Sequence, residues 1–327
     1  MWTRVSDVEA ARTWDRDLAV FPDRSMTQTF RWGAYKAHGG WTPLRLVAHD
    51  AHGRLQAMLQ VLARRYPART SVTWCPGGLA GPIEFWNAGL LECMSASLGA
   101  WQLYCRVAFN RAKNLDDVEY LRMQGWRSPS RHLSASRTMI WSLGSSDDEM
   151  MAGLSGNWRH NVRRAQQRHP HVERWTNPSP AALGATYAAM SSQKGMAPEF
   201  NAAELSAMLQ SLDGQIVMYG CADDAGTPLA FRACLIQGDR AWDLLAATAP
   251  EGRRSYASYA VLWKLVRHCS SAGVKAYDLS GVDPIKAPGV YDFKRGTGAL
   301  EQESLGEWEW ATSALLRRAV GIRMRVS

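Results

Sequence analysis

Short apolar runs separated by polar turns, and interrupted by helical patterns, dominate the first part of the chain. Apolar runs between turn signals are typical of buried strands, whereas apolar residues three and four positions apart indicate amphipathic helices. This pattern predicts strands at 44–48, 55–62, 72–75, 103–109 and 138–143, and helices near 85–98 and 115–124. The first part is therefore predicted to be a mixed α/β domain.

A strong break follows the last of these strands. Gly144 precedes two serines and three acidic residues, which suit the N-cap and first turn of a new helix. The second part then repeats the first in outline, with predicted strands at 172–175, 215–221, 228–237, 240–246 and 275–279, and helices near 180–193, 202–212 and 256–272. Since the chain of 327 residues is also too long for one typical domain, we expect two domains that divide at residue 144.

Residues 277–298 concentrate the candidate chemistry. A predicted strand enters a turn rich in glycine and proline, a second extended piece follows at 290–293, and Lys294 comes directly after it. A lysine there can serve as a point charge for a phosphate or for the oxyanion of an acyl-transfer intermediate. The alternative from spacing alone is that Lys294 and Arg295 are solvated surface charges.

A one-sided basic helix is predicted near residues 154–168. Its apolar stripe is formed by Leu154, Trp158, Val162 and Ala165, and its cations are Arg159, Arg163, Arg164 and Arg168. Such a face can contact RNA phosphates without reading sequence, and it can equally be a solvated helix surface.

Several stretches resemble the FemABX family of aminoacyl-tRNA-dependent peptidyltransferases. They are residues 278–284, 289–296 and 305–308 near the end of the chain, and 27–43, 154–168 and 254–281 before it. The resemblance implies an α/β (α+β) fold of two GNAT-like acyltransferase domains packed side by side, each a mixed, mostly antiparallel sheet flanked by helices. It also implies an acceptor-binding domain formed by residues 1–144 and completed by residues 304–327. Residues 145–303 are expected to form the donor-binding and catalytic domain. Without a sustained heptad repeat, the chain looks like the compact form that lacks the coiled-coil arm.

The resemblance implies roles for individual residues. Lys294 is expected to be the catalytic positive group, and Phe293 is expected to shape the cleft. Arg295 and the four arginines of the basic helix are expected to contact the tRNA, with Arg295 near the donor's phosphates. Acceptor binding is expected at Lys36 and Trp32, at Lys194 with an uncertainty of one position, and at Tyr256 and Tyr259, which line the cleft. The implied activity moves an amino acid from aminoacyl-tRNA to an amine of a UDP-linked or lipid-linked muropeptide, or of a related peptide, without a covalent enzyme intermediate.

The main alternative is a GNAT-type N-acyltransferase that uses acyl- or acetyl-CoA on an envelope sugar or a natural-product amine. The two hypotheses differ in the acyl donor. Such enzymes need a glycine-rich loop at a helix start so that the pyrophosphate can approach the backbone. Residues 253–260 lack both glycines, which favours aminoacyl-tRNA as co-substrate and no cofactor. A non-catalytic protein that binds RNA or a membrane surface is the second alternative.

Composition narrows the partners and the location. The net charge of +8 suits a polyanionic partner, for which we expect tRNA and not DNA. Six scattered cysteines predict neither a disulfide framework nor a metal site. The polar, acidic start and the lack of a long apolar stretch predict a cytoplasmic protein. The tail carries Arg317, Arg318, Arg323 and Arg325 among apolar residues, so it can contact the inner face of a membrane peripherally or dock as a terminal helix.

Overall fold

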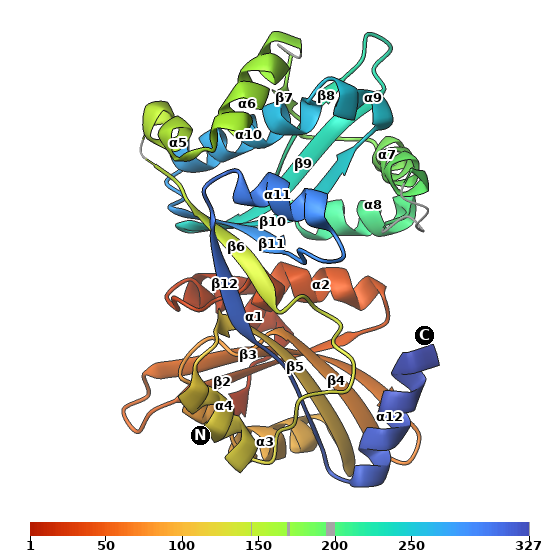
Figure 1. The fold of residues 1–327 in the computed structure, drawn as a ribbon. Helices are drawn as coiled ribbons and strands as arrows, with labels where there is room; N and C mark the ends of the chain where they lie inside the picture. The colour runs from red at the N-terminus through yellow and green to blue at the C-terminus, as the bar shows by residue number, and fades with distance from the viewer. Residues whose placement is uncertain (145, 169–170, 194–199, 327) are drawn as a thin grey trace. The chain divides into compact units, whose positions relative to one another are not determined.

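The computed structural model describes residues 1–144, 146–168, 171–193 and 200–326, which form two compact units (Figure 1). Unit 1 comprises Met1–Ser136 and Glu303–Ser327, and unit 2 comprises Arg137–Gln302. Residues 137–143 therefore lie in unit 2, whereas the boundary expected at 144 placed them in the first domain. The physical reason is that the strand in this segment pairs with a strand of unit 2.

Unit 1 is built on six strands, with helices in the connections. Its elements are β1 (Trp2–Arg4), α1 (Asp7–Leu18), the 3₁₀ turn η1 (Met26–Gln28), α2 (Phe30–His38), β2 (Thr42–His49), β3 (Leu55–Tyr66), β4 (Thr70–Gly77), the 3₁₀ turn η2 (Ile83–Phe85), α3 (Ala88–Leu98), β5 (Gln102–Ala112), α4 (Leu115–Met123), β12 (Leu300–Ala311) and α12 (Ala314–Val326). The strand order is β1-β2-β3-β4-β5-β12, and β4 with β5 is its parallel pair.

The described residues of unit 2 form a second set of six strands. Its elements are β6 (Arg137–Ser142), α5 (Asp147–Gly153), α6 (Gly156–Arg168), β7 (Glu173–Arg174), α7 (Pro180–Ser192), α8 (Ala202–Ser211), β8 (Ile216–Ala222), β9 (Pro228–Gln237), β10 (Arg240–Thr248), α9 (Pro250–Arg254), α10 (Ala257–Ser271), β11 (Ala276–Gly281) and α11 (Pro288–Arg295). The order β7-β8-β9-β10-β11-β6 repeats that of unit 1, with β10 and β11 as the parallel pair.

The connections repeat as well. Two helices join the first and second strands of each six-strand set, α1 with α2 in unit 1 and α7 with α8 in unit 2. One long helix, α3 or α10, joins each parallel pair, and α4 or α11 follows it. The sixth strand comes from elsewhere in the chain: β12 completes unit 1 from the C-terminal side, and β6 completes unit 2 from the N-terminal side.

The two parallel pairs differ in length. In unit 1, β4 and β5 pair continuously from Thr70 with Gln102 to Gly77 with Phe109. In unit 2, β10 and β11 pair only from Arg240 with Ala276 to Trp242 with Asp278. Beyond this point the two strands part, and Asp243, the next residue of β10, belongs to the group of charged side chains described below.

One predicted element has the wrong conformation. Residues 290–293 were expected to be extended, but they lie in helix α11. Pro288 occupies the first turn, where its fixed φ favours a helix and its missing N–H leaves no donor unsatisfied. No helix in the described part of the chain combines the length and the apolar character that crossing a bilayer requires.

Candidate active site

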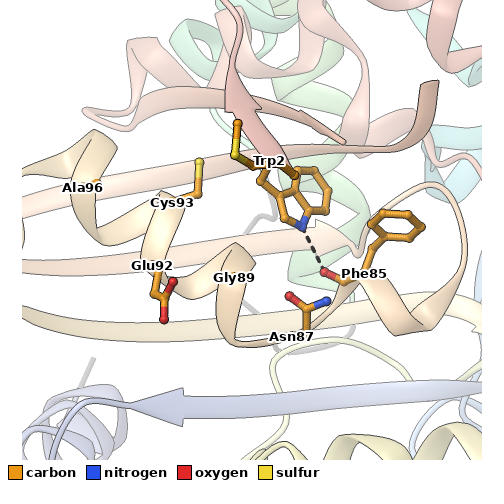
Figure 2. A pocket seen from close by; sticks show the side chains of 8 residues that line it. Trp2, Phe85, Asn87, Gly89, Glu92, Cys93 and Ala96 are labelled. Carbon is orange, nitrogen blue, oxygen red and sulfur yellow. Dashed lines mark hydrogen bonds between the residues drawn. The ribbon is translucent and has the colours of Figure 1, made fainter. Parts of the chain in front are cut away.

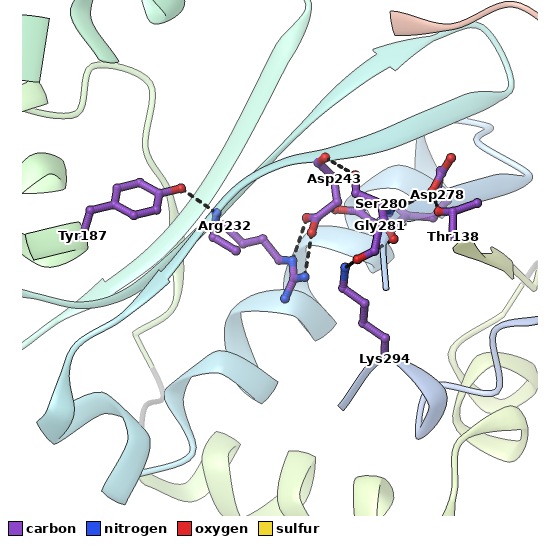
Figure 3. A network of polar contacts seen from close by, with 10 residues as sticks. Thr138, Tyr187, Arg232, Asp243, Asp278, Ser280, Gly281 and Lys294 are labelled. Carbon is purple, nitrogen blue, oxygen red and sulfur yellow. Dashed lines mark hydrogen bonds and ion pairs between the residues drawn. The ribbon is translucent and has the colours of Figure 1, made fainter. Parts of the chain in front are cut away.

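Lys294 lies in the interior of unit 2. Its side chain extends from α11 toward β11, and only 6 % of the residue is exposed (Figure 3). Its Nζ donates hydrogen bonds to the carbonyl oxygens of Gly281 at 2.9 Å and Ser280 at 3.3 Å. The alternative of a solvated surface charge is therefore wrong for Lys294. An ammonium group has three donors, and these two carbonyls account for two of them.

The backbone of β11 is shaped to offer these carbonyls. The strand bulges against β6 between Asp278 and Gly281, and Ser280 adopts a left-handed conformation with φ of 63°. A carboxylate oxygen of Asp278 accepts from the Ser280 N–H at 2.8 Å and also from the Thr138 hydroxyl. The Ser280 hydroxyl donates to the carbonyl of Asp243 at 2.6 Å. These bonds hold a backbone geometry that is unfavourable for a residue other than glycine.

A buried ion pair lies beside the lysine. Arg232 on β9 donates two hydrogen bonds to the carboxylate of Asp243 on β10, both at 2.7 Å, and the Tyr277 hydroxyl donates to the same carboxylate at 3.0 Å. The side chains of Arg232 and Asp243 are buried. A bidentate arginine–carboxylate pair has a fixed geometry, so it places the Asp243 charge rigidly beside the lysine.

These surroundings explain the acidity of Lys294. Burial lowers its pKa from 10.5 to about 8, the charge of Arg232 also lowers it, and the carboxylates of Asp243 and Asp278 oppose the change. Burial in turn raises the pKa of Asp278, against the hydrogen bonds from Thr138 and Ser280. The lysine is thus a stronger acid than a lysine in water and still mostly cationic at neutral pH.

Aromatic rings enclose the lysine's helix. Phe293 packs against Trp158 and Tyr259, with ring centroids 5.4 and 5.0 Å away, and Trp158 Nε1 donates to the Phe293 carbonyl at 2.8 Å. The Arg232 guanidinium carbon lies 5.5 Å from the centroid of the Phe293 ring. Phe293 therefore contacts Tyr259, Trp158 and the arginine of the buried ion pair within unit 2.

The basic helix α6 reaches the start of α10. Tyr256, the residue before α10, has φ of 63°, and its hydroxyl accepts a hydrogen bond from Arg164 at 3.2 Å. The guanidinium carbons of Arg164 and Arg168 lie 4.9 and 5.7 Å from the Tyr256 ring centroid. A second cluster thus joins two predicted tRNA contacts with one predicted cleft residue.

The remaining predicted cations of unit 2 have other surroundings. Arg163 is exposed, and Arg159 donates to the carbonyl of Leu154 at 2.5 Å, so it secures the turn before α6. Arg295 is exposed and pairs with Asp292 at 2.9 Å. Lys194 lies outside the described residues.

Lys36 and Trp32 lie together on α2 in unit 1. The Lys36 Nζ is 5.0 Å from the centroid of the Trp32 ring. Lys36 also lines a pocket of about 250 Å³ with Trp41, Trp74 and Arg106, and the buried Arg106 pairs with Glu307. A separate pocket of about 460 Å³ in unit 1 lies between β1 and α3 and is lined mainly by apolar and neutral side chains (Figure 2). Of the two predicted acceptor contacts in unit 1, Lys36 lines the first pocket, and Trp32 lines neither pocket.

Sequence reasoning missed Arg232 as part of this site and left two alternatives open for Asp243, an acid that faces the cleft or a structural hydrogen-bond partner. A signal was available, because each is an isolated charge in an otherwise apolar strand, within LAFRACL and AWDLLAA. Charges are rarely buried unless they are paired, so two such strands predict a buried ion pair.

Comparison with known proteins identifies the fold. Residues 156–295 match the family described as acetyltransferase (GNAT) domain, and this segment contains Lys294, Arg232 and Asp243. FemX has a similar structure, with a TM-score of 0.82 and 15 % identity over 98 % of this chain and 100 % of that one. A tandem GNAT protein from the clavulanic acid biosynthesis pathway has a TM-score of 0.57 at 13 % identity, over 96 % of this chain and 98 % of its own.

A more distant structure is the C-terminal domain of a putative lysylphosphatidylglycerol synthetase from Agrobacterium fabrum, with a TM-score of 0.52 at 10 % identity, over 98 % of this chain and 97 % of that one. No curated protein matches the sequence. The chain therefore has a tandem GNAT-type acyltransferase fold like that of FemX, and the fold expected from the sequence resemblance is confirmed.

Proposed function

We propose that the protein is an aminoacyltransferase that moves an amino acid from aminoacyl-tRNA to an amine of a peptidoglycan precursor or a related peptide. The observation that carries this proposal is the buried ammonium of Lys294, held by two carbonyls where β10 and β11 part. A parted parallel pair leaves backbone groups that can bind an acyl chain, and the ammonium beside it can stabilise negative charge.

The chemistry needs no covalent enzyme intermediate. The acceptor amine attacks the ester carbonyl of the donor, and the third donor of Lys294 stabilises the oxyanion of the tetrahedral intermediate. The C–O bond to the ribose then breaks as Lys294 gives its proton to the departing oxygen. The proton lost by the attacking nitrogen restores the ammonium. A pKa of about 8 suits this exchange, because the lysine can both lose and regain its proton near neutral pH.

The neighbouring hydroxyls support direct transfer. Tyr277 and Ser280 both donate to Asp243, so their protons are already engaged, and burial raises the pKa of Tyr277. The Ser280 hydroxyl faces a backbone carbonyl, which is no general base, and the carboxylate beside Tyr277 is already paired with Arg232, so neither hydroxyl has the free base that an activated nucleophile requires. Lys294 is thus the group in this cluster best suited to the reaction, and it acts by charge and proton transfer.

The donor is assigned from the start of α10. Here the left-handed residue is Tyr256, where a glycine would let a pyrophosphate approach the backbone. The Tyr256 ring also has Arg164 and Arg168 packed against it. An aromatic ring next to arginines suits the bases and phosphates of an RNA end, which supports aminoacyl-tRNA as the donor and the arginines of α6 as its contacts.

In this proposal unit 1 binds the acceptor. Lys36 stands at a pocket lined by tryptophans, so it combines a charge for a phosphate with apolar surface for the rest of the ligand. A UDP-linked or lipid-linked muropeptide has both features.

An acyl-CoA-dependent N-acyltransferase is the second candidate, because residues 156–295 match an acetyltransferase domain. The two are separated by offering the purified protein either total tRNA charged with radiolabelled amino acids or labelled acetyl-CoA, each with candidate amine acceptors. Transfer that ribonuclease abolishes supports aminoacyl-tRNA. Transfer from acetyl-CoA that ribonuclease leaves intact contradicts it.

Lys294→Met tests the assigned group. Loss of one donor to an oxyanion lowers kcat by about 10²–10³ in comparable sites. Lys286→Met is the matched control, because Lys286 is exposed and belongs to the turn before the same helix. Full activity in Lys294→Met, or an equal loss in both variants, would remove Lys294 from the mechanism.

A further inference from the structure

Three segments of unit 1 meet at the start of β5. The N–H groups of Trp101 and Gln102 both donate to the carbonyl of Arg69, at 2.9 and 3.2 Å. The Gln102 side chain accepts from the hydroxyl of Thr312 at 2.9 Å and from that of Ser313 at 3.4 Å, directly before α12 (Figure 1). These contacts bring residues 65–69, 100–102 and 312–322 together, and we call the surface of these three segments the tail face.

The tail face exposes large apolar side chains. Trp101 is 71 % exposed, Leu315 is 79 % exposed and Ile322 is 63 % exposed. Leu315 and Ile322 are seven positions apart on α12, so they lie on one side of the helix, two turns from each other. Single exposed apolar side chains are ordinary in proteins, but three large ones on one surface indicate a binding site.

The charge of the tail face has a single sign. The three segments contain no Asp or Glu, and their cations are Arg65, Arg69, Arg317 and Arg318. Arg65, Arg69 and Arg318 are exposed, and the guanidinium carbon of Arg69 lies 4.4 Å from the centroid of the Trp101 ring. The surface therefore offers apolar anchors bordered by cations that bind phosphate.

We propose that the tail face binds the surface of a bilayer that contains anionic phospholipids. Arginines attract the lipid phosphates, Trp101 suits the interface between headgroups and acyl chains, and Leu315 with Ile322 can enter the acyl boundary from a helix that lies in the plane of the membrane. An RNA backbone would satisfy the arginines but would leave the two aliphatic side chains in water. The combination therefore favours a lipid surface, independently of which acyl donor the enzyme uses.

Co-sedimentation with vesicles of phosphatidylcholine, with and without phosphatidylglycerol, tests this proposal. The wild-type chain should bind the vesicles that contain phosphatidylglycerol, and less strongly as salt is added. Leu315→Ser/Ile322→Ser should weaken binding about tenfold or more, since both side chains lose apolar burial. Arg318→Gln should weaken it about fivefold.

The matched control is Ile285→Ser/Leu300→Ser, because these side chains are 89 % and 73 % exposed but lie outside the tail face. It should bind as the wild type does, and all variants should keep the wild-type Tm. Absence of binding to anionic vesicles, or an equal loss in the control, overturns the proposal. So does a wild type that binds total tRNA and not vesicles, with tRNA binding lost in Arg318→Gln.

Discussion

Replacing Lys294 by methionine should change how the stability of the protein depends on pH. Its pKa of about 8, against 10.5 for an ordinary lysine, corresponds to about 3 kcal/mol that disfavours the charged lysine in the folded chain. The sign follows from proton binding. Between pH 8 and 10.5 the unfolded chain keeps the proton on Lys294 and the folded chain releases it, so the free energy of unfolding rises with pH in this window.

Lys294→Met lacks this contribution. Relative to the variant, the wild-type protein should therefore gain about 2–3 kcal/mol between pH 7 and pH 10. Other groups titrate in the same range, but they contribute equally to both proteins and cancel in the difference. Urea unfolding at several pH values measures it, provided that the denaturant dependence is the same for both proteins.

The control is Lys286→Met, which removes an exposed lysine and should leave the difference from wild type nearly constant with pH. A constant difference for Lys294→Met as well would mean that Lys294 titrates as a solvated lysine. In that case neither the buried position of the ammonium nor its proposed role as an acid near neutral pH could be correct.

Two further predictions follow from the same unit. The rate of acyl transfer should fall at alkaline pH through an apparent pKa of about 8. Asp278→Asn should move that fall to lower pH, because the carboxylate raises the pKa of Lys294. Initial rates measured across this pH range check both predictions, and an unchanged pH profile in the variant contradicts the assignment. Gly252→Ala should lower the free energy of unfolding by about 1–3 kcal/mol and therefore lower Tm, since the new Cβ would lie 2.2 Å from the carbonyl oxygen of Leu229. Gly321→Ala is the control and should not lower Tm, because its Cβ would meet nothing within 4 Å.

Much of the fold could be predicted from local patterns. The predicted helix at 256–272 is α10, and the predicted strand at 240–246 forms most of β10, because both segments carry the apolar period of their element. Helices α1 and α2 were not predicted as such. The failure at 290–293 has a different cause: Val, Tyr and Phe favour strands locally, but the packing of Phe293 against Trp158 and the burial of Lys294 favour a helix.

The site could be predicted only in part. The resemblance indicated Lys294, but nothing in residues 277–298 alone reveals that a lysine after a turn is buried. Its pKa depends in part on the charges of Asp243 and Arg232, which lie on separate strands and meet only when β9 and β10 pair. The left-handed Ser280, which directs a carbonyl to the lysine, also has no local signal, since serine rarely adopts this conformation.

The internal repeat of the fold explains why the chemistry is assigned to unit 2. Both units have the same strand order and one parallel pair, so either could have held a site between those strands. In unit 1 that pair remains closed as far as Gly77 and Phe109, and its backbone groups bond to each other. In unit 2 the pair opens after Trp242 and Asp278, at the position where the buried charges gather. Since an acyl donor can bond to backbone groups only where the ladder is open, this difference supports the proposal that the chemistry takes place in unit 2 and that unit 1 binds the second substrate.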